Sequence, residues 1–260
     1  MELTLYQVDA FTGKLFGGNP AAVCPLDKWL DDALMQSIAL ENNLSETAFF
    51  VKEGTHYHIR WFTPLEEVPL CGHATLASSF VIFNFIEKDA DKLFFNSQSG
   101  ELIVEKENDL LTLNFPSSPP AACEMKDVLL TPFKEKPIEA LYAEDTYILV
   151  FETEREIREM KPDIKSITNV DSHAIITTAK GDDADFVSRF FAPKIGLDED
   201  PVTGFAHTLL TPYWAQKLNK NKMHALQVSK RGGGLFIENL DNRVKIAGKA
   251  ALYFVGKINV

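Results

Sequence analysis

The stretch RWFTPLEEVPLCGHATLA, residues 60–77, has a counterpart in RFFAPKIGLDEDPVTGFA, residues 189–206. The opening residues of the two stretches match, and at the same offset Cys71 falls on Asp200 and Ala77 falls on Ala206. Both stretches run from a predicted strand through a loop into an apolar helix. Because the order of the elements agrees as well as the residues, we interpret the chain as two related halves.

Hydrophobic periodicity predicts many short strands and few helices. Strands are expected over residues 3–8, 47–51, 57–62, 101–106, 110–115, 172–179, 235–238 and 244–246, with one strand-like segment over 140–151. Helices are expected over residues 29–40, 73–83, 154–160 and 205–217. Residues 13–20 are expected to form a loop with Gly17-Gly18-Asn19-Pro20 at its tip.

A proline-rich segment lies near the middle of the chain. Pro116-Ser117-Ser118-Pro119-Pro120 has no periodicity and is typical of a linker. We therefore predict an N-terminal lobe over residues 1–115, which a C-terminal strand over 250–260 could join. The C-terminal lobe is predicted over residues 121–249.

Composition and charge limit the classes of function. The chain has 260 residues and a formal net charge of −11, which argues against binding nucleic acid through its phosphates. Cys24, Cys71 and Cys123 are too far apart for a disulfide framework or a zinc site. The N-terminus does not resemble a signal peptide, and no apolar run is long enough to span a bilayer. These features favour a cytoplasmic protein with neither a nucleic-acid nor a membrane partner.

Residues 67–73 and 198–204 are loops that each open a predicted helix. Helix N-termini carry unpaired N–H groups and attract anions. Gly72 and Gly204 would let a ligand approach the backbone closely. If the two halves face each other, both helix starts converge on one cleft. Such a cleft suits a small carboxylate whose neighbouring carbon gains or loses a proton.

Three ionisable residues are candidates for this chemistry. Glu46 enters an otherwise apolar strand, where it could be a general acid/base or a solvated carboxylate at a strand end. His73 lies in the first turn of a helix, where the dipole disfavours a charged ring, so a neutral imidazole is expected. Asp200 precedes a proline and could simply cap a helix. For any one of these residues a purely structural role is the commoner one. The positions of all three in a repeat favour a catalytic role.

Several motifs resemble those of the PhzF-like family of phenazine biosynthesis. They are Val8-Asp9-Ala10-Phe11-Thr12, Gly18-Asn19-Pro20-Ala21-Ala22-Val23, Leu44-Ser45-Glu46-Thr47-Ala48-Phe49, Arg60-Trp61-Phe62-Thr63-Pro64, Glu67-Val68-Pro69-Leu70-Cys71-Gly72-His73-Ala74-Thr75 and Glu199-Asp200-Pro201-Val202-Thr203-Gly204. The resemblance implies an α+β fold similar to diaminopimelate epimerase. Each lobe would be a closed, mostly antiparallel, barrel-like sheet around a central helix, with the site in the cleft between the lobes.

The resemblance also implies an isomerase without metal or organic cofactor, and a homodimer. Its acid/base glutamate matches Glu46, and its supporting histidine and aspartate match His73 and Asp200. The expected substrate-binding residues are Asn19, Ser45, Gly72, Thr203, Gly204 and Phe205. The family usually has serine where this chain has Phe205, which puts a phenazine precursor in doubt as the substrate.

Three other functions stay open. An epimerase could use Cys71 alone, since a two-thiol mechanism is excluded by Asp200 at the matching position. A hydrolase using Cys71 and His73 is disfavoured, because residues two apart on a helix do not face each other. A protein that only binds a small carboxylate is favoured by Phe205 and disfavoured by the set Glu46, His73 and Asp200.

Overall fold

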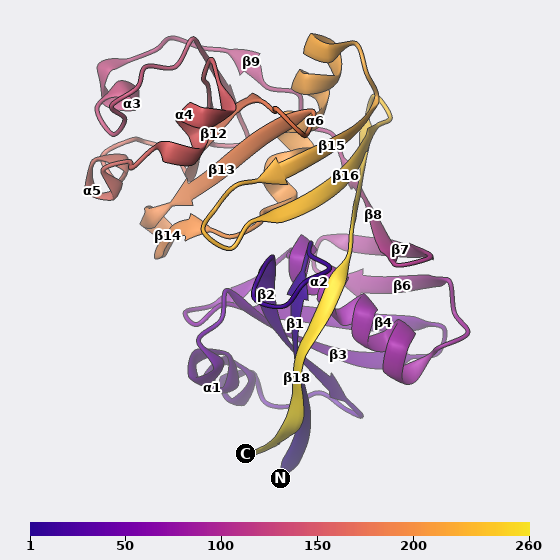
Figure 1. Ribbon diagram of the computed structural model, residues 1–260. Helices are drawn as coiled ribbons and strands as arrows, with labels where there is room; N and C mark the ends of the chain where they lie inside the picture. The colour runs from indigo at the N-terminus through magenta and orange to yellow at the C-terminus, as the bar shows by residue number, and fades with distance from the viewer. The chain divides into compact units, whose positions relative to one another are not determined.

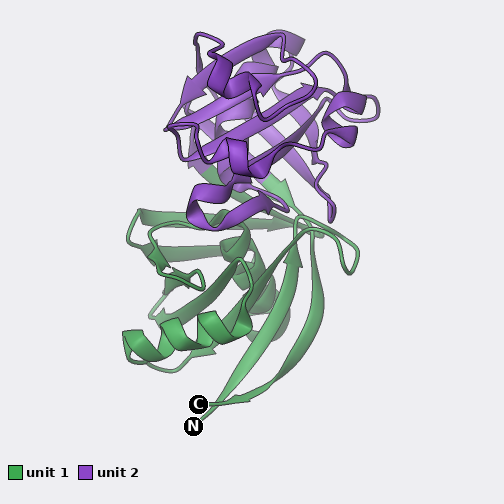
Figure 2. Ribbon diagram, turned by 90° about the vertical axis from the view of Figure 1, so that its left-hand side faces the viewer, with its two compact units in different colours: residues 1–114, 247–260 green, residues 115–246 purple.

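The computed structural model describes all 260 residues, which pack into two compact units. Unit 1 comprises residues 1–114 and 247–260, and unit 2 comprises residues 115–246 (Figure 2). Whether each unit folds alone as a domain stays a prediction. No helix is both long and apolar enough to cross a membrane.

Unit 1 consists mainly of strands and has few helices. Its strands are β1 (Glu2–Ala10), β2 (Asn19–Leu26), β3 (Glu46–Glu53), β4 (His56–Phe62), β5 (Glu67–Val68), β6 (Lys92–Ser97), β7 (Gly100–Glu107), most of β8 (Leu110–Pro116) and β18 (Ala250–Asn259). Its helices are α1 (Asp32–Asn42) and α2 (Gly72–Val81), which continues into the π-helical turn η1 (Ile82–Ile86). The C-terminal strand β18 pairs with β1 and brings the two chain ends together (Figure 1).

Unit 2 has the same kinds of element. Its strands are β9 (Ala121–Ala122), β10 (Glu139–Ala143), β11 (Thr146–Val150), β12 (Ala174–Lys180), β13 (Phe186–Ala192), β14 (Leu197–Asp200), β15 (Lys222–Gln227), β16 (Gly233–Asn239) and most of β17 (Arg243–Gly248). Its helices are α3 (Asp127–Leu130), α4 (Glu154–Glu159), α5 (Ile164–Ile167), the 3-10 turn η2 (Pro193–Ile195) and α6 (Gly204–Leu218).

The strand pairings repeat between the units. In unit 1, β2 is antiparallel to β1 and parallel to β3, β4 is antiparallel to β3 and β5, and β6 is parallel to β4 and antiparallel to β7. In unit 2, β11, β12, β13, β14, β15 and β16 follow β10 with the same alternation of directions. The internal repeat inferred from the sequence is therefore present in the hydrogen-bonding pattern.

The residue-by-residue match within the repeat needs a correction after the first strand. Arg60 pairs with a carboxylate 7 positions ahead, whereas Arg189 pairs with one 10 positions ahead. The three extra residues lie around η2, between β13 and β14. The starts of α2 and α6 then coincide, so Cys71 corresponds to Thr203. The predicted match of Cys71 with Asp200 is wrong.

The predicted closed sheet in each half is also wrong. The strands are linked in one open 18-stranded sheet, and no ladder joins β18 to β8 or β9 to β17. Closing a barrel requires the first and last strands to pair, and strand patterns in a sequence do not reveal that pairing.

Helix α2 is buried nearly all round and packs on β1, β2 and β3. Its small residues permit this close packing, as expected for a helix without a polar face. The hydroxyls of Thr75, Ser78 and Ser79 donate to backbone carbonyls four positions earlier, at 2.6, 2.8 and 2.8 Å. Every buried hydroxyl of this helix is thereby satisfied.

Two predicted segments have different structures. Residues 140–151 form the hairpin β10–β11, because Glu144 and Asp145 turn the chain with φ of 47° and 51°. Asn19 and Pro20 were expected at a loop tip but begin β2. The turn lies at Gly18, where φ is 62° and any Cβ would lie 2.1 Å from the Ala10 carbonyl oxygen.

Candidate active site

In unit 1, Glu46 and His73 lie in direct contact. Glu46 is the first residue of β3 and is aligned with Ala21 of the parallel neighbour β2. His73 is the second residue of α2. Glu46 Oε2 lies 3.1 Å from His73 Nε2, and the two side chains are 18% and 7% exposed. The contact is close enough for an ion pair, although the atoms are not aligned as a hydrogen bond.

The protonation of His73 follows from its neighbours. Burial disfavours the imidazolium, but the contacts with Cys71 and Glu46 favour it and outweigh burial, so the pKa of His73 is raised well above its usual value. The neutral imidazole expected from the helix dipole stays a prediction. His73 Nε2 is thus placed against the Glu46 carboxyl group.

Cys71 faces the other side of the same ring. Its Sγ lies 3.5 Å from His73 Nδ1. The expectation that the two side chains would not meet is wrong, because Cys71 is the N-cap of α2 and has extended backbone angles. Burial, reinforced by the Glu46 charge, raises the pKa of the Cys71 thiol, so the thiol stays protonated at neutral pH.

Asn19 and Ser45 extend this cluster. The buried Asn19 side chain places Nδ2 at 3.3 Å from His73 Nδ1, and Ser45 Oγ donates to Asn19 Oδ1 at 3.4 Å. Both residues were predicted to bind substrate. In this structure both act on the orientation of His73.

Neither α2 nor α6 has a side-chain cap at its N-terminus. The N-cap residues are Cys71 and Thr203, and neither side chain bonds to the first turn. Gly72 and Gly204 begin the two helices. The first-turn N–H groups are therefore available to a carboxylate in each unit. The predicted convergence of the two helix starts on one cleft stays a prediction.

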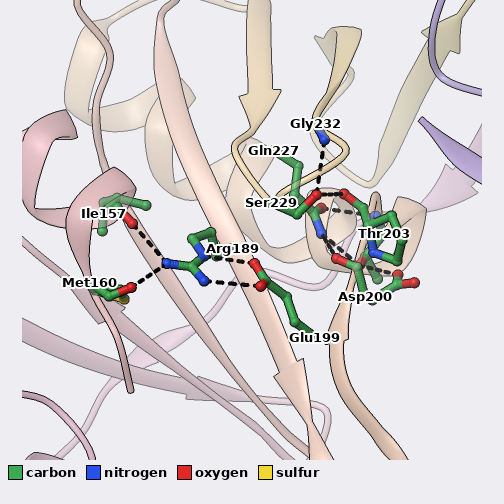
Figure 3. Close-up of polar contacts among 10 residues, drawn as sticks. Ile157, Met160, Arg189, Glu199, Asp200, Thr203, Gln227, Ser229 and Gly232 are labelled. Atoms are coloured by element: carbon green, nitrogen blue, oxygen red, sulfur yellow. Dashed lines mark hydrogen bonds and ion pairs between the residues drawn. The ribbon is translucent and has the colours of Figure 1, made fainter. Parts of the chain in front are cut away.

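In unit 2, Asp200 ends β14 and is 6% exposed. Its Oδ2 accepts a hydrogen bond from the Thr203 hydroxyl. Gln227, at the end of β15, bonds to the backbone of both residues (Figure 3). The sequence analysis missed Gln227. This residue precedes the glycine run 232–234 by a few positions and belongs to no recognisable motif.

An arginine clamps the strand on which Asp200 lies. Arg189 makes a bidentate ion pair with Glu199 at 2.7 and 2.9 Å, and its third nitrogen donates to the carbonyls of Ile157 and Met160 (Figure 3). Arg60 and Glu67 form the same bidentate pair in unit 1, at 2.7 and 2.7 Å. The same arginine–glutamate pair thus holds the loop before α2 in unit 1 and the loop before α6 in unit 2.

Phe205 and His207 lie on opposite sides of α6. Phe205, in the first turn, is 39% exposed. His207 is fully buried, stacks on Phe186, and makes a 2.8 Å hydrogen bond to the Thr203 carbonyl. Burial lowers the pKa of His207 to about 4, so its ring is neutral and Nδ1–H is the donor.

The cluster in unit 1 contains possible metal ligands. The donor atoms of Glu46, Cys71 and His73 all lie within 4.8 Å of one another. However, His73 meets Cys71 through Nδ1 and Glu46 through Nε2, on opposite sides of the ring. One ion could not use His73 together with both neighbours in this arrangement.

Comparisons with known proteins agree with these observations. The family model described as phenazine biosynthesis-like protein, PhzC-PhzF, matches residues 8–256. A Pseudomonas aeruginosa protein named an uncharacterized isomerase is 47% identical over 260 residues, covering 100% of both chains.

Solved structures show the same fold. A crystal structure from Enterococcus faecalis, described as a phenazine biosynthesis protein of the PhzF family, superimposes with a TM-score of 0.98 at 45% identity, covering 100% of both chains. A predicted epimerase from Pseudomonas aeruginosa shares the fold alone, with a TM-score of 0.76 at 17% identity and 99% of both chains covered.

Proposed function

This chain belongs to the phenazine biosynthesis-like PhzC-PhzF family, and from that membership we propose that it is an isomerase that moves a proton on a small carboxylate substrate. Glu46 is the acid/base in this proposal, and the proposed reaction needs no metal or organic cofactor. The name of the Pseudomonas aeruginosa relative supports the reaction class. The observation that carries the proposal is the 3.1 Å contact between Glu46 Oε2 and the buried His73 Nε2.

The proposed reaction is a balanced proton shift. The Glu46 carboxylate removes a proton from a carbon next to the substrate's carboxylate, and the electron pair left behind spreads onto the carboxylate oxygens. First-turn N–H groups of α2, at Gly72 and His73, stabilise that charge. Where a double bond is conjugated with the first carbon, the electron pair also reaches a second carbon. The proton returns from Glu46 to that second carbon, the double bond shifts by one position, and His73 stays beside the carboxylate that Glu46 regains. Asp200 is proposed as a second proton-handling group.

Deuterium exchange tests the proposal directly. We expect the protein to incorporate deuterium from heavy water into small cyclic or α-substituted carboxylates, followed by NMR. Glu46→Gln should slow incorporation by about 10²–10⁴-fold, the usual contribution of a general acid/base. Glu53→Gln, at the exposed end of the same strand, is the matched control and should be without effect. Incorporation at the wild-type rate in Glu46→Gln would contradict the proposal.

Metal dependence is tested in the same assay. Because the proposed step moves only a proton, EDTA should leave the rate of incorporation unchanged. Loss of exchange in EDTA and its recovery with added Zn²⁺ would assign the Glu46, Cys71 and His73 cluster to a metal instead.

One alternative is an epimerase that uses the Cys71 thiol. It is favoured by the 3.5 Å distance between Cys71 Sγ and His73 Nδ1. The raised pKa of Cys71 argues against it, since the thiolate is the active base. Cys71→Ala should retain most of the exchange. Exchange that is lost in Cys71→Ala and kept in Glu46→Gln would favour the thiol mechanism.

A protein that only binds carboxylates is favoured by the exposed ring of Phe205 at the start of α6. Calorimetry would then show carboxylate binding while no substrate incorporates deuterium. Detectable exchange that depends on Glu46 excludes this alternative.

A homodimer completes the proposal, and β18 offers a surface for it. Tyr253, Phe254 and Val255 are consecutive and 50%, 45% and 49% exposed, and Phe16 contacts the Tyr253 ring. Exposed apolar patches of this kind mark interaction surfaces. Light scattering should show a dimer that Tyr253→Lys with Val255→Lys converts to a monomer. Leu65→Lys, at an isolated exposed leucine, should leave the dimer intact.

A further inference from the structure

Gln227 connects the segments on both sides of the Asp200 carboxylate. Its side chain is almost fully buried at 1% exposed. Nε2 donates to the Asp200 carbonyl at 2.8 Å and to Thr203 Oγ1 at 3.1 Å, while Oε1 accepts from the Thr203 N–H at 2.9 Å (Figure 3). All polar hydrogens of the amide are therefore used within one loop.

The orientation of this amide is decided by the backbone. A main-chain N–H can only donate, so Thr203 N–H must face Oε1. A main-chain carbonyl can only accept, so the Asp200 carbonyl must face Nε2. Flipping the amide would set donor against donor and acceptor against acceptor, which a buried site does not tolerate. The second Nε2 hydrogen therefore points at Thr203 Oγ1.

The direction of the next bond follows. Because Thr203 Oγ1 already accepts a hydrogen from Gln227, its own hydrogen is directed to Asp200 Oδ2. Oδ2 is thus an acceptor in this network.

Neighbouring bonds hold the same loop. Ser229 Oγ donates to the Pro201 carbonyl at 2.8 Å and accepts from the Gly232 N–H at 3.1 Å. Glu199, on the other side of Asp200, is held by Arg189. The residues before and after Asp200 are therefore both fixed.

We propose that Gln227 is a positioning residue that, through the Thr203 hydroxyl, holds the Asp200 carboxylate with Oδ2 engaged. This inference deepens the proposed function and rests on it, since it gives Asp200 its role there. It also makes Thr203 part of the support of Asp200, where the sequence predicted contact with substrate. A donor that favours the ionised carboxylate makes Asp200 harder to protonate.

The test is the titration of Asp200 in the full-length protein, followed by the ¹³C NMR signal of its carboxyl carbon. Thr203→Val removes only the hydroxyl and should raise the titration midpoint by about one pH unit, as expected for one lost hydrogen bond to a charge. Gln227→Met keeps the side-chain length, frees the hydroxyl to rotate, and should raise the midpoint by a smaller amount. Thr203→Ser keeps the hydroxyl and should restore the wild-type midpoint.

A matched control removes the same kind of bond elsewhere. Gln36 donates to the Thr63 carbonyl at 2.9 Å in unit 1, and Gln36→Met should leave the Asp200 midpoint unchanged. If Gln227→Met does not fold, the Thr203→Val and Thr203→Ser pair still decides the matter. An unchanged midpoint in Thr203→Val overturns the proposal, as does an unchanged midpoint in a folded Gln227→Met.

The readout does not depend on turnover. If exchange depends on Glu46 but the Asp200 midpoint never moves, the proposed function stands and the role of Gln227 is wrong. If the midpoint moves as expected and no carboxylate exchanges deuterium, the network is real and the proposed function fails.

Discussion

Phe205 is the residue that we expect to bear most directly on substrate choice. Its ring is 39% exposed in the first turn of α6, where the family resemblance implies a serine. Phe205→Ser should lower the KM for hydroxylated cyclic carboxylates by about 3–10-fold, the value of one hydrogen bond. Phe205→Ala, which opens the space without adding a hydroxyl, is the control. Equal effects of the two substitutions would show that size alone matters.

The candidate site residues of the two units differ in how far the sequence could place them. Glu46 and His73 stood in recognisable motifs, and the structure brings them within 3.1 Å. The contact of Cys71 with His73 could not be predicted from helical spacing, because the helix begins one residue after Cys71. Gln227 could not be found at all, since its partners are 24 and 27 positions away and only the fold brings them together.

The two arginine clamps give a prediction for whole elements. Arg189→Lys should cost about 2 kcal/mol of the free energy of unfolding, because lysine cannot bond Glu199 in bidentate fashion and also reach the carbonyls of Ile157 and Met160. Arg60→Lys should cost less, since its third nitrogen bonds only the exposed Asp32. Urea denaturation measures both.

The control for the clamps is Arg155→Lys, because Arg155 and Glu159 form an exposed pair on α4. We expect a change of no more than about 0.5 kcal/mol there. If all three substitutions had equal costs, the clamps would contribute no more than surface pairs.

The β10–β11 hairpin shows why one element boundary was missed and how to stabilise it. Residues 140–151 resemble one strand, and Glu144, unlike Asp145, is not a usual turn residue with positive φ. Glu144→Asn should therefore add about 0.5–1 kcal/mol to the free energy of unfolding, since asparagine tolerates this backbone conformation better. Glu124→Asn, at an exposed loop residue without positive φ, should add nothing.

For the whole molecule, the repeat was predicted correctly, whereas the predicted closure of each sheet and the residue register of the repeat were wrong. The paired segments around Arg60 and Arg189 carried the repeat, and the pattern of strand directions bears it out. The three extra residues near η2 shifted the match of Cys71 from Thr203 to Asp200. A gap of that size has no signature in hydrophobic periodicity, so only the strand ladders could reveal it.

The buried His207 links the stability of the protein to pH. Its ring is neutral when folded, and burial lowers its pKa to about 4, below the value of about 6.5 in an unfolded chain. As the pH falls from about 6.5 to about 4, the unfolded state gains a proton that the folded state does not. The stabilisation is thus fully present above about pH 6.5 and is lost toward pH 4, by about 3 kcal/mol.

Substitution of His207 tests this dependence. His207→Asn keeps an N–H donor for the Thr203 carbonyl but cannot titrate, so its unfolding free energy should fall less steeply than that of the wild type between about pH 6.5 and pH 4. His73 does not interfere, because it is present in the wild type and in the variant and its contribution cancels in the comparison. His173→Asn, at an exposed histidine, should keep the wild-type slope. A wild-type slope in His207→Asn as well would assign the acid sensitivity to the carboxylates, because they are unchanged in every variant.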